Sequence, residues 1–187
     1  MARKKRSRPR RHIEPIFRSV NAGGVGTSPG TPVYIGDHEP NEAVFSLIQY
    51  NQEEISFVTP QSVEEVLVML EDSSVNWINI NGLADQDAIK RLGGFFRLDP
   101  LTVEDILNTE HRPKVEDFGH YLLIITKMLT RRSDESIEYE QVSMIITRNA
   151  VITVQETLGD CFNPVRDRLR SGAGRLRRVK TIAQGFL

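Results

Sequence analysis

The sequence predicts an α/β fold, a mixed sheet of parallel and antiparallel strands flanked by helices. Two observations carry this prediction. Short strand and helix patterns alternate between residues 33 and 109, whereas β-branched and apolar runs separated by polar turns cluster between residues 121 and 155. A chain of 187 residues with 39% hydrophobic residues is also long enough for one domain with a real core. Interleaved elements followed by clustered strands favour a mixed sheet with helical cover.

The first half of the chain opens with short candidate strands at Val33–Ile35 and Glu54–Val58. Ser62, with Glu65 three residues later, then forms a capping-box pattern, and apolar residues recur behind it at helical spacing as far as about Glu71. Residues 75–80 alternate apolar and polar side chains and end at an Asn-Gly turn pair. We therefore expect two short strands, a short helix and a third strand in this order.

Two further helices follow. Asp85 is a candidate N-cap for a helix whose apolar positions are Ile89, Leu92, Phe95 and Phe96, with a Gly-Gly pair near its end. Asp99 and Pro100 then match the N-cap and N1 positions of a helix that we expect to reach about Thr109.

The second half predicts an antiparallel meander over residues 121–129, 139–146 and 151–155. Arg148-Asn149 is a plausible tight hairpin, since Asn tolerates the left-handed conformation that such turns require. Asn163 and Pro164 match the N-cap and N1 positions of a basic helix.

Charge is strongly segregated along the chain, although the formal net charge is only −1. Residues 1–31 are basic and rich in Gly and Pro, which predicts a flexible tail, and the segment from residue 165 onward is also basic. Residues 21–164 carry 23 acidic against 9 basic side chains. An acidic body repels nucleic acid and concentrates cations, although such surfaces also arise for solubility alone.

Several function classes are disfavoured by composition. A single cysteine, Cys161, excludes an internal disulfide and a multi-thiolate zinc site, and it fits a reducing, cytoplasmic compartment. The four histidines are too scattered for a zinc motif, and no nucleophile-elbow pattern is present. The basic start lacks the apolar stretch of a secretory signal, and no apolar run approaches membrane-spanning length. We expect neither an enzyme nor a membrane-spanning segment within these residues.

Glu104 and Asp105 are the candidate metal-ligating residues. Helical periodicity places them beside the apolar face defined by Val103, Ile106 and Leu107, on a flank that we expect to be exposed. Mg²⁺ prefers oxygen ligands and keeps several of its waters, so one or two carboxylates on a rigid element are enough for a weak site. Spacing alone favours the alternative, in which the two carboxylates face solvent and bind nothing.

Five segments together resemble the CorA family of divalent-cation channels. In chain order they are WINING (77–82), LDPLTVEDILNTEHRPKVEDF (98–118), YLLIITKML (121–129), EQVSMIITRNAVITVQE (140–156) and FNPVRDRLRSGAGRLRR (162–178). The resemblance implies an α/β/α cytoplasmic domain over residues 32–178 that assembles as a homopentamer on the cytoplasmic face of the cell membrane. It also implies that Asp105 and Glu104 lie at a protomer interface and bind regulatory Mg²⁺, with Asp105 the better candidate. Residues 179–187 depart from the family pattern, and the family's stalk and pore segments are absent from this sequence.

The expected function is therefore Mg²⁺ sensing within a CorA-like magnesium or cobalt channel, without transport by this polypeptide alone. One alternative is a free-standing acidic α/β domain that binds protein partners and senses no ion. Another treats the basic tail as a nucleic-acid arm, which the acidic body opposes. We expect homo-oligomerisation and no nucleic-acid partner.

Overall fold

The computed structural model describes residues 32–36, 39–172 and 175–178, so the predicted tail (1–31) and the divergent end (179–187) lie outside the described residues. The strands are β1 (Val44–Tyr50), β2 (Ile55–Val58), β3 (Val75–Asn81), β4 (Lys114–Asp117), β5 (Leu122–Arg131), β6 (Ile137–Ile146) and β7 (Ala150–Gln155). The helices are α1 (Val63–Met69), α2 (Gln86–Phe96), α3 (Pro100–Leu107), α4 (Asn163–Ser171) and the 3₁₀ turn η2 (Leu176–Arg178).

A seven-stranded sheet runs through the molecule in the order β2-β1-β3-β7-β6-β5-β4. Strands β3 and β7 pair in parallel, and the other neighbouring pairs among the described strands are antiparallel. Consecutive strands β5, β6 and β7 form the predicted meander. The predicted mixed sheet is therefore confirmed.

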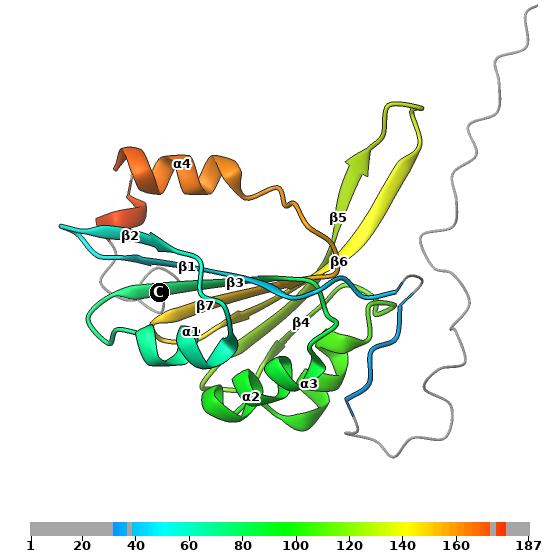
Figure 1. Cartoon of the computed structure of the whole chain (residues 1–187), viewed down its shortest axis with the longest axis horizontal. Helices are drawn as coiled ribbons and strands as arrows, with labels where there is room; N and C mark the ends of the chain where they lie inside the picture. The colour runs from blue at the N-terminus through cyan, green and yellow to red at the C-terminus, as the bar shows by residue number, and fades with distance from the viewer. Residues whose placement is uncertain (1–31, 37–38, 173–174, 179–187) are drawn as a thin grey trace, which may run out of the picture.

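Helices cover both faces of this sheet (Figure 1). Helices α1, α2 and α3 lie on one face and α4 lies on the opposite face. The arrangement confirms an α/β/α sandwich, in which three helices cover one face and a single short helix covers part of the other.

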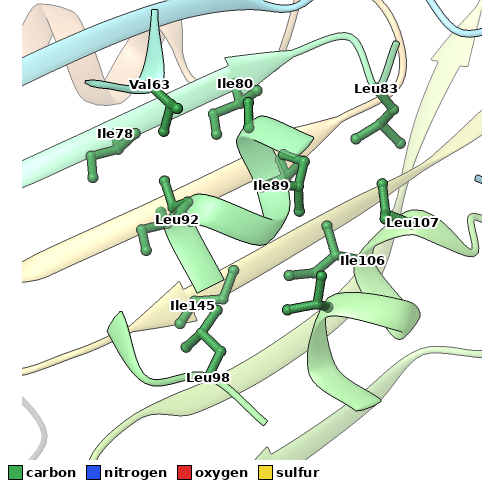
Figure 2. Close-up of a cluster of buried hydrophobic side chains, with 14 of the residues drawn as sticks. Val63, Ile78, Ile80, Leu83, Ile89, Leu92, Leu98, Ile106, Leu107 and Ile145 are labelled. Atoms are coloured by element: carbon green, nitrogen blue, oxygen red, sulfur yellow. The ribbon is translucent and has the colours of Figure 1, made fainter. Parts of the chain in front are cut away.

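The main core fills the space between the sheet and helices α1–α3 (Figure 2). Ile78 and Ile80 of β3 and Ile145 of β6 point from the sheet toward Ile89 and Leu92 of α2. Each of these side chains is at most 1% exposed. The predicted apolar positions of α2 therefore do anchor that helix, except that Phe95 is exposed.

Helix α4 is attached by a smaller and more polar set of contacts. Leu169 packs against Trp77 and Ile48 of the sheet. Arg166 places its guanidinium 5.1 Å from the centre of the Trp77 ring and donates through both terminal nitrogens to Asp160. The Asp160 side chain is 4% exposed. The predicted strand over residues 75–80 is thus buried, with Trp77 only 6% exposed.

Two strands were not predicted. The sequence of β1, VFSLIQY, lacks a clear alternation because β1 lies inside the sheet and has buried side chains on both faces, Leu47 and Ile48 among them. Strand β4 has the sequence KVED and forms the edge of the sheet, where charged residues are common because they discourage pairing with other chains.

Two local predictions were wrong, and a third was right for a different reason. Residues 33–35 form no strand; Ile35 makes an isolated parallel bridge to Asn108 at the end of α3. The N-cap of α4 is Phe162 without a side-chain cap, and Asn163 already lies in the helix. The predicted hairpin at Arg148-Asn149 is confirmed, because β6 and β7 pair antiparallel on either side of it, but neither residue has a positive φ. Instead, Thr147 closes the turn with hydrogen bonds from its backbone N–H to the Ala150 carbonyl and from the Ala150 N–H to its hydroxyl group.

Candidate functional site

Helix α3 carries both predicted site residues, and its N-terminus is fixed from two sides. The Asp99 carboxylate accepts a hydrogen bond from the Leu101 backbone N–H at 2.8 Å, and Pro100 follows at the first helical position. The Tyr121 hydroxyl of the neighbouring chain segment accepts from the Asp99 backbone N–H at 3.1 Å and bonds the buried Thr102 hydroxyl at 2.8 Å. The predicted cap is confirmed, and the buried Tyr121 adds a tertiary anchor.

The C-terminal half of α3 is fixed by a residue of the sheet. The buried Gln141 side chain of β6 donates to the backbone carbonyls of Asp105 and Asn108 at 3.1 and 3.2 Å. The helix ends at Leu107 rather than at Thr109, with Asn108 as its C-cap. Because its backbone is held at both ends, α3 presents Glu104 and Asp105 from a rigid position.

The Asp105 carboxylate is enclosed by two basic side chains. His111 Nε2 lies 2.8 Å from Asp105 Oδ1, and Lys114 Nζ lies 2.6 Å from Asp105 Oδ2. Lys114 Nζ also lies 3.0 Å from Glu116 Oε2. Asp105 is only 14% exposed, so the prediction of an exposed position was wrong. Periodicity put Asp105 on the flank of the helix, but it did not show that the following loop and β4 fold back over that flank.

The pKa of Asp105 lies below its ordinary value. Partial burial raises the pKa of this carboxyl, but hydrogen bonds and charge interactions with His111 and Lys114 more than offset that effect. The pKa of Lys114 lies above its ordinary value. Burial lowers this pKa, but the hydrogen bonds and charge interactions with Asp105 and Glu116 more than offset that effect. Asp105 is therefore held as a carboxylate and Lys114 as an ammonium group at neutral pH.

These side chains line an open pocket of about 620 Å³. Five carboxylates line this pocket. They belong to α3, to its N-cap residue and to β4: Asp99, Glu104, Asp105, Glu116 and Asp117. His111 and Lys114 are the basic residues in the lining. Acidic oxygens thus outnumber basic groups, so the pocket favours cations over anions.

A family comparison identifies the class of protein. The CorA-like Mg²⁺ transporter family matches residues 72–187, which includes α3, the pocket and β4. The chain belongs to this family.

The cobalt/magnesium transport protein CorA of Thermotoga maritima is 42% identical over 156 residues. That alignment covers 83% of this chain and 44% of the relative, so the chain spans less than half the length of that CorA protein. Among the described residues, no helix is both long enough and apolar enough to cross a bilayer.

Solved structures also resemble the chain. Full-length CmaX matches with a TM-score of 0.58 and 13% identity over 81% of this chain and 45% of CmaX, a level that supports the shared fold alone. The complete CorA magnesium transporter of Methanocaldococcus jannaschii matches with a TM-score of 0.47 and 16% identity, over 72% of this chain and 38% of that protein.

The lining of the pocket offers carboxylate oxygens. Carboxylate oxygens are the ligands that Mg²⁺ prefers, and a pocket of this size accommodates an ion that keeps several waters. Both Asp105 oxygens already accept from basic groups. Within the described part of the chain, moreover, no three His, Cys, Asp or Glu residues are grouped closely enough to hold a metal ion.

Sequence reasoning missed the basic partners of Asp105. His111 and Lys114 lie six and nine residues after it, beyond the end of the helix, so no helical spacing connects them to Asp105. The available signal was the density of charged residues in HRPKVE, because charged side chains and proline are common on edge strands.

A second pocket lies where β5 and β6 extend past the end of β7. It mixes acidic and basic groups, with Lys127 bonded at 2.6 Å to the Thr109 carbonyl and Glu140 bonded to the Thr157 hydroxyl. Burial lowers the pKa of Lys127 and raises that of Glu140. Because both signs of charge line this pocket, its composition favours no single class of ligand.

Proposed function

We propose that this chain is the cytoplasmic, Mg²⁺-sensing regulatory region of a CorA-type divalent-cation channel, with Glu104 and Asp105 facing the regulatory ion. The observation that carries the proposal is the rigid presentation of this carboxylate pair at an acidic pocket by α3. Membership of the CorA-like family adds the link to Mg²⁺ transport.

The proposal includes homo-oligomerisation, as a pentamer at the cytoplasmic face of the cell membrane. Exposed apolar side chains on α2 and α3 support a protein contact at these helices. Phe95 and Leu101 are 54% and 53% exposed, and Leu101 lines the pocket itself. A cation between two acidic protomer surfaces would reduce their repulsion and favour assembly. Permeation through this chain alone is not part of the proposal.

The test is a Mg²⁺ titration followed by calorimetry and by sedimentation velocity. We expect binding in the millimolar range or weaker, about −4 kcal/mol or less favourable, because a water-rich site with few direct ligands binds Mg²⁺ weakly. Asp105→Asn should abolish this binding. Asp87→Asn is the matched control, because Asp87 is also a helical aspartate paired with a lysine, Lys90 at 3.0 Å, but lies outside the pocket.

Mg²⁺ binding that is equal in Asp105→Asn and wild type would refute the assignment of Asp105. Mg²⁺ binding lost equally in both variants would indicate a general effect of acidic charge and would also refute it.

The free-standing interaction domain has one observation in its favour, the same exposed Phe95 and Leu101. It predicts association that is independent of Mg²⁺. Sedimentation of the wild type with Mg²⁺ and with a chelator separates the two proposals.

A further inference from the structure

We propose that Lys114 is an internal counter-ion of the candidate cation pocket, and that a divalent cation displaces the Lys114 ammonium group when it contacts Asp105 directly. The inference rests on the proposed function, because it concerns how cations reach the proposed site. The inference adds Lys114 of β4 to a site otherwise assigned to α3. It also adds one step, the exchange of the Lys114 ammonium group for a divalent cation.

The geometry of Asp105 motivates the exchange. Lys114 Nζ lies 2.6 Å from Oδ2 and His111 Nε2 lies 2.8 Å from Oδ1, so both carboxylate oxygens have a basic nitrogen within hydrogen-bond distance. A metal ion that binds a carboxylate oxygen at about 2.1 Å needs the space that such a nitrogen occupies. Direct coordination therefore requires one basic group to leave.

Lys114 is the group suited to move, whereas Asp105 is not. The Asp105 backbone is tied to Gln141, and α3 is anchored at its start by Tyr121. Lys114 has a long flexible side chain that is 28% exposed, and its second partner Glu116 is 44% exposed. When Lys114 leaves Asp105, its ammonium group can therefore remain paired with Glu116.

The exchange also favours divalent over monovalent cations. Replacing one ammonium charge by Na⁺ or K⁺ beside the carboxylate gains no net electrostatic attraction. Replacing the ammonium group by Mg²⁺ doubles the positive charge that faces the acidic oxygens. The electrostatic attraction between the cation and these oxygens increases in proportion. Lys114 thus lowers the affinity of the pocket for every cation, and the divalent ions alone recover part of that loss.

The experiment compares Mg²⁺ binding to the wild-type chain, to Lys114→Met and to Lys90→Met. Met keeps most of the Lys side-chain volume and removes the charge. Lys90→Met is the matched control, because this substitution changes the net charge by the same amount. Like Lys114, Lys90 is paired with an aspartate, Asp87 at 3.0 Å, but it does not line the pocket. We expect Lys114→Met to tighten Mg²⁺ binding by about tenfold, equivalent to about 1.4 kcal/mol. Lys90→Met should leave it nearly unchanged, since solvent and salt screen a distant exposed charge.

A second measurement follows Lys114 itself. In the wild type, the NMR signals of the Lys114 side chain should shift during a Mg²⁺ titration and stay unchanged during a K⁺ titration at matched ionic strength. Circular dichroism and the melting temperature establish that Lys114→Met is folded. If it is not, Lys114→Gln and the wild-type NMR titration decide the question.

The outcomes separate the two claims. If Asp105→Asn loses Mg²⁺ binding but Lys114→Met binds no more tightly than Lys90→Met, the counter-ion role is refuted and the Mg²⁺ site stands. If Asp105→Asn binds like the wild type, the proposed site fails and the exchange fails with it. Absence of binding by both the wild type and Lys114→Met would also overturn both claims.

Discussion

Two aspartates on opposite faces of the sheet are each paired with a basic side chain, but the two pairs differ in geometry. Arg166 donates to Asp160 through both terminal guanidinium nitrogens and lies over the Trp77 ring, and the Asp160 side chain is 4% exposed. Lys114 meets Asp105 through a single ammonium group at the wall of an open pocket. The planar guanidinium is fixed by its two bonds and by stacking, whereas an ammonium group on a flexible stem is easily redirected.

We propose that this difference separates a structural ion pair from an exchangeable one. The pKa of both aspartates is lowered, and in both cases burial raises it while the basic partner more than offsets the burial. The direction of the pKa shift therefore does not distinguish the two sites. The two sites differ instead in the exposure of the aspartate and in the number of bonds to its basic partner. Both differences favour Asp105 as the proposed ion-responsive carboxylate.

The largest effect is expected where α4 meets the sheet. Trp77→Ala removes the side chain that contacts both Leu169 and Arg166, and such a truncation should cost about 3–5 kcal/mol. Urea unfolding followed by circular dichroism measures the loss. A change of less than about 1 kcal/mol would show that α4 is held by other contacts.

Arg166→Met tests the structural ion pair more narrowly. Loss of the charged hydrogen bonds should cost about 1.5–3 kcal/mol at neutral pH. Because the folded-state pKa of Asp160 lies below its unfolded value, the pair contributes stability above the unfolded pKa and loses it as pH falls through the folded pKa. The stability gap between the wild type and Arg166→Met should therefore shrink as pH drops below about 4. A gap that stays constant down to acid unfolding would mean that Arg166 acts by packing alone.

Neighbouring glycines test how tightly α3 is packed. A Cβ on Gly93 would lie 2.7 Å from Val103 Cγ2 of α3, whereas a Cβ on Gly94 meets no atom within 4 Å among the described residues. Gly93→Ala should cost about 1–3 kcal/mol through overpacking. Gly94→Ala should instead stabilise the helix by about 0.5–1 kcal/mol. Equal effects in the two variants would contradict the close contact between α2 and α3.

Local sequence signals predicted the elements well where one residue type determines the geometry. Asp85, Asp99 and Pro100 begin helices as expected, because capping and proline effects act within one turn. Phe95 was predicted as part of the apolar face of α2 and is exposed, since periodicity cannot show where the cover of a helix ends.

The candidate site was predicted only in part. Glu104 and Asp105 were proposed from their position on the helix, but the approach of Lys114 depends on β4 pairing with β5, a long-range contact. A four-residue charged edge strand has no hydrophobic pattern to indicate such pairing. The degree of burial of Asp105 was therefore not available from the sequence.

The most direct test of the central claim locates the ion. Mn²⁺ prefers carboxylate and water ligands, as Mg²⁺ does, and broadens NMR signals of nearby amides. A Mn²⁺ titration of the wild-type chain should broaden the amides of α3 and β4 first, leave the Asp160–Arg166 region sharp, and lose this selectivity in Asp105→Asn. Broadening centred on Asp160, or an unchanged pattern in Asp105→Asn, would contradict the assignment of the α3 carboxylates as the cation-responsive site.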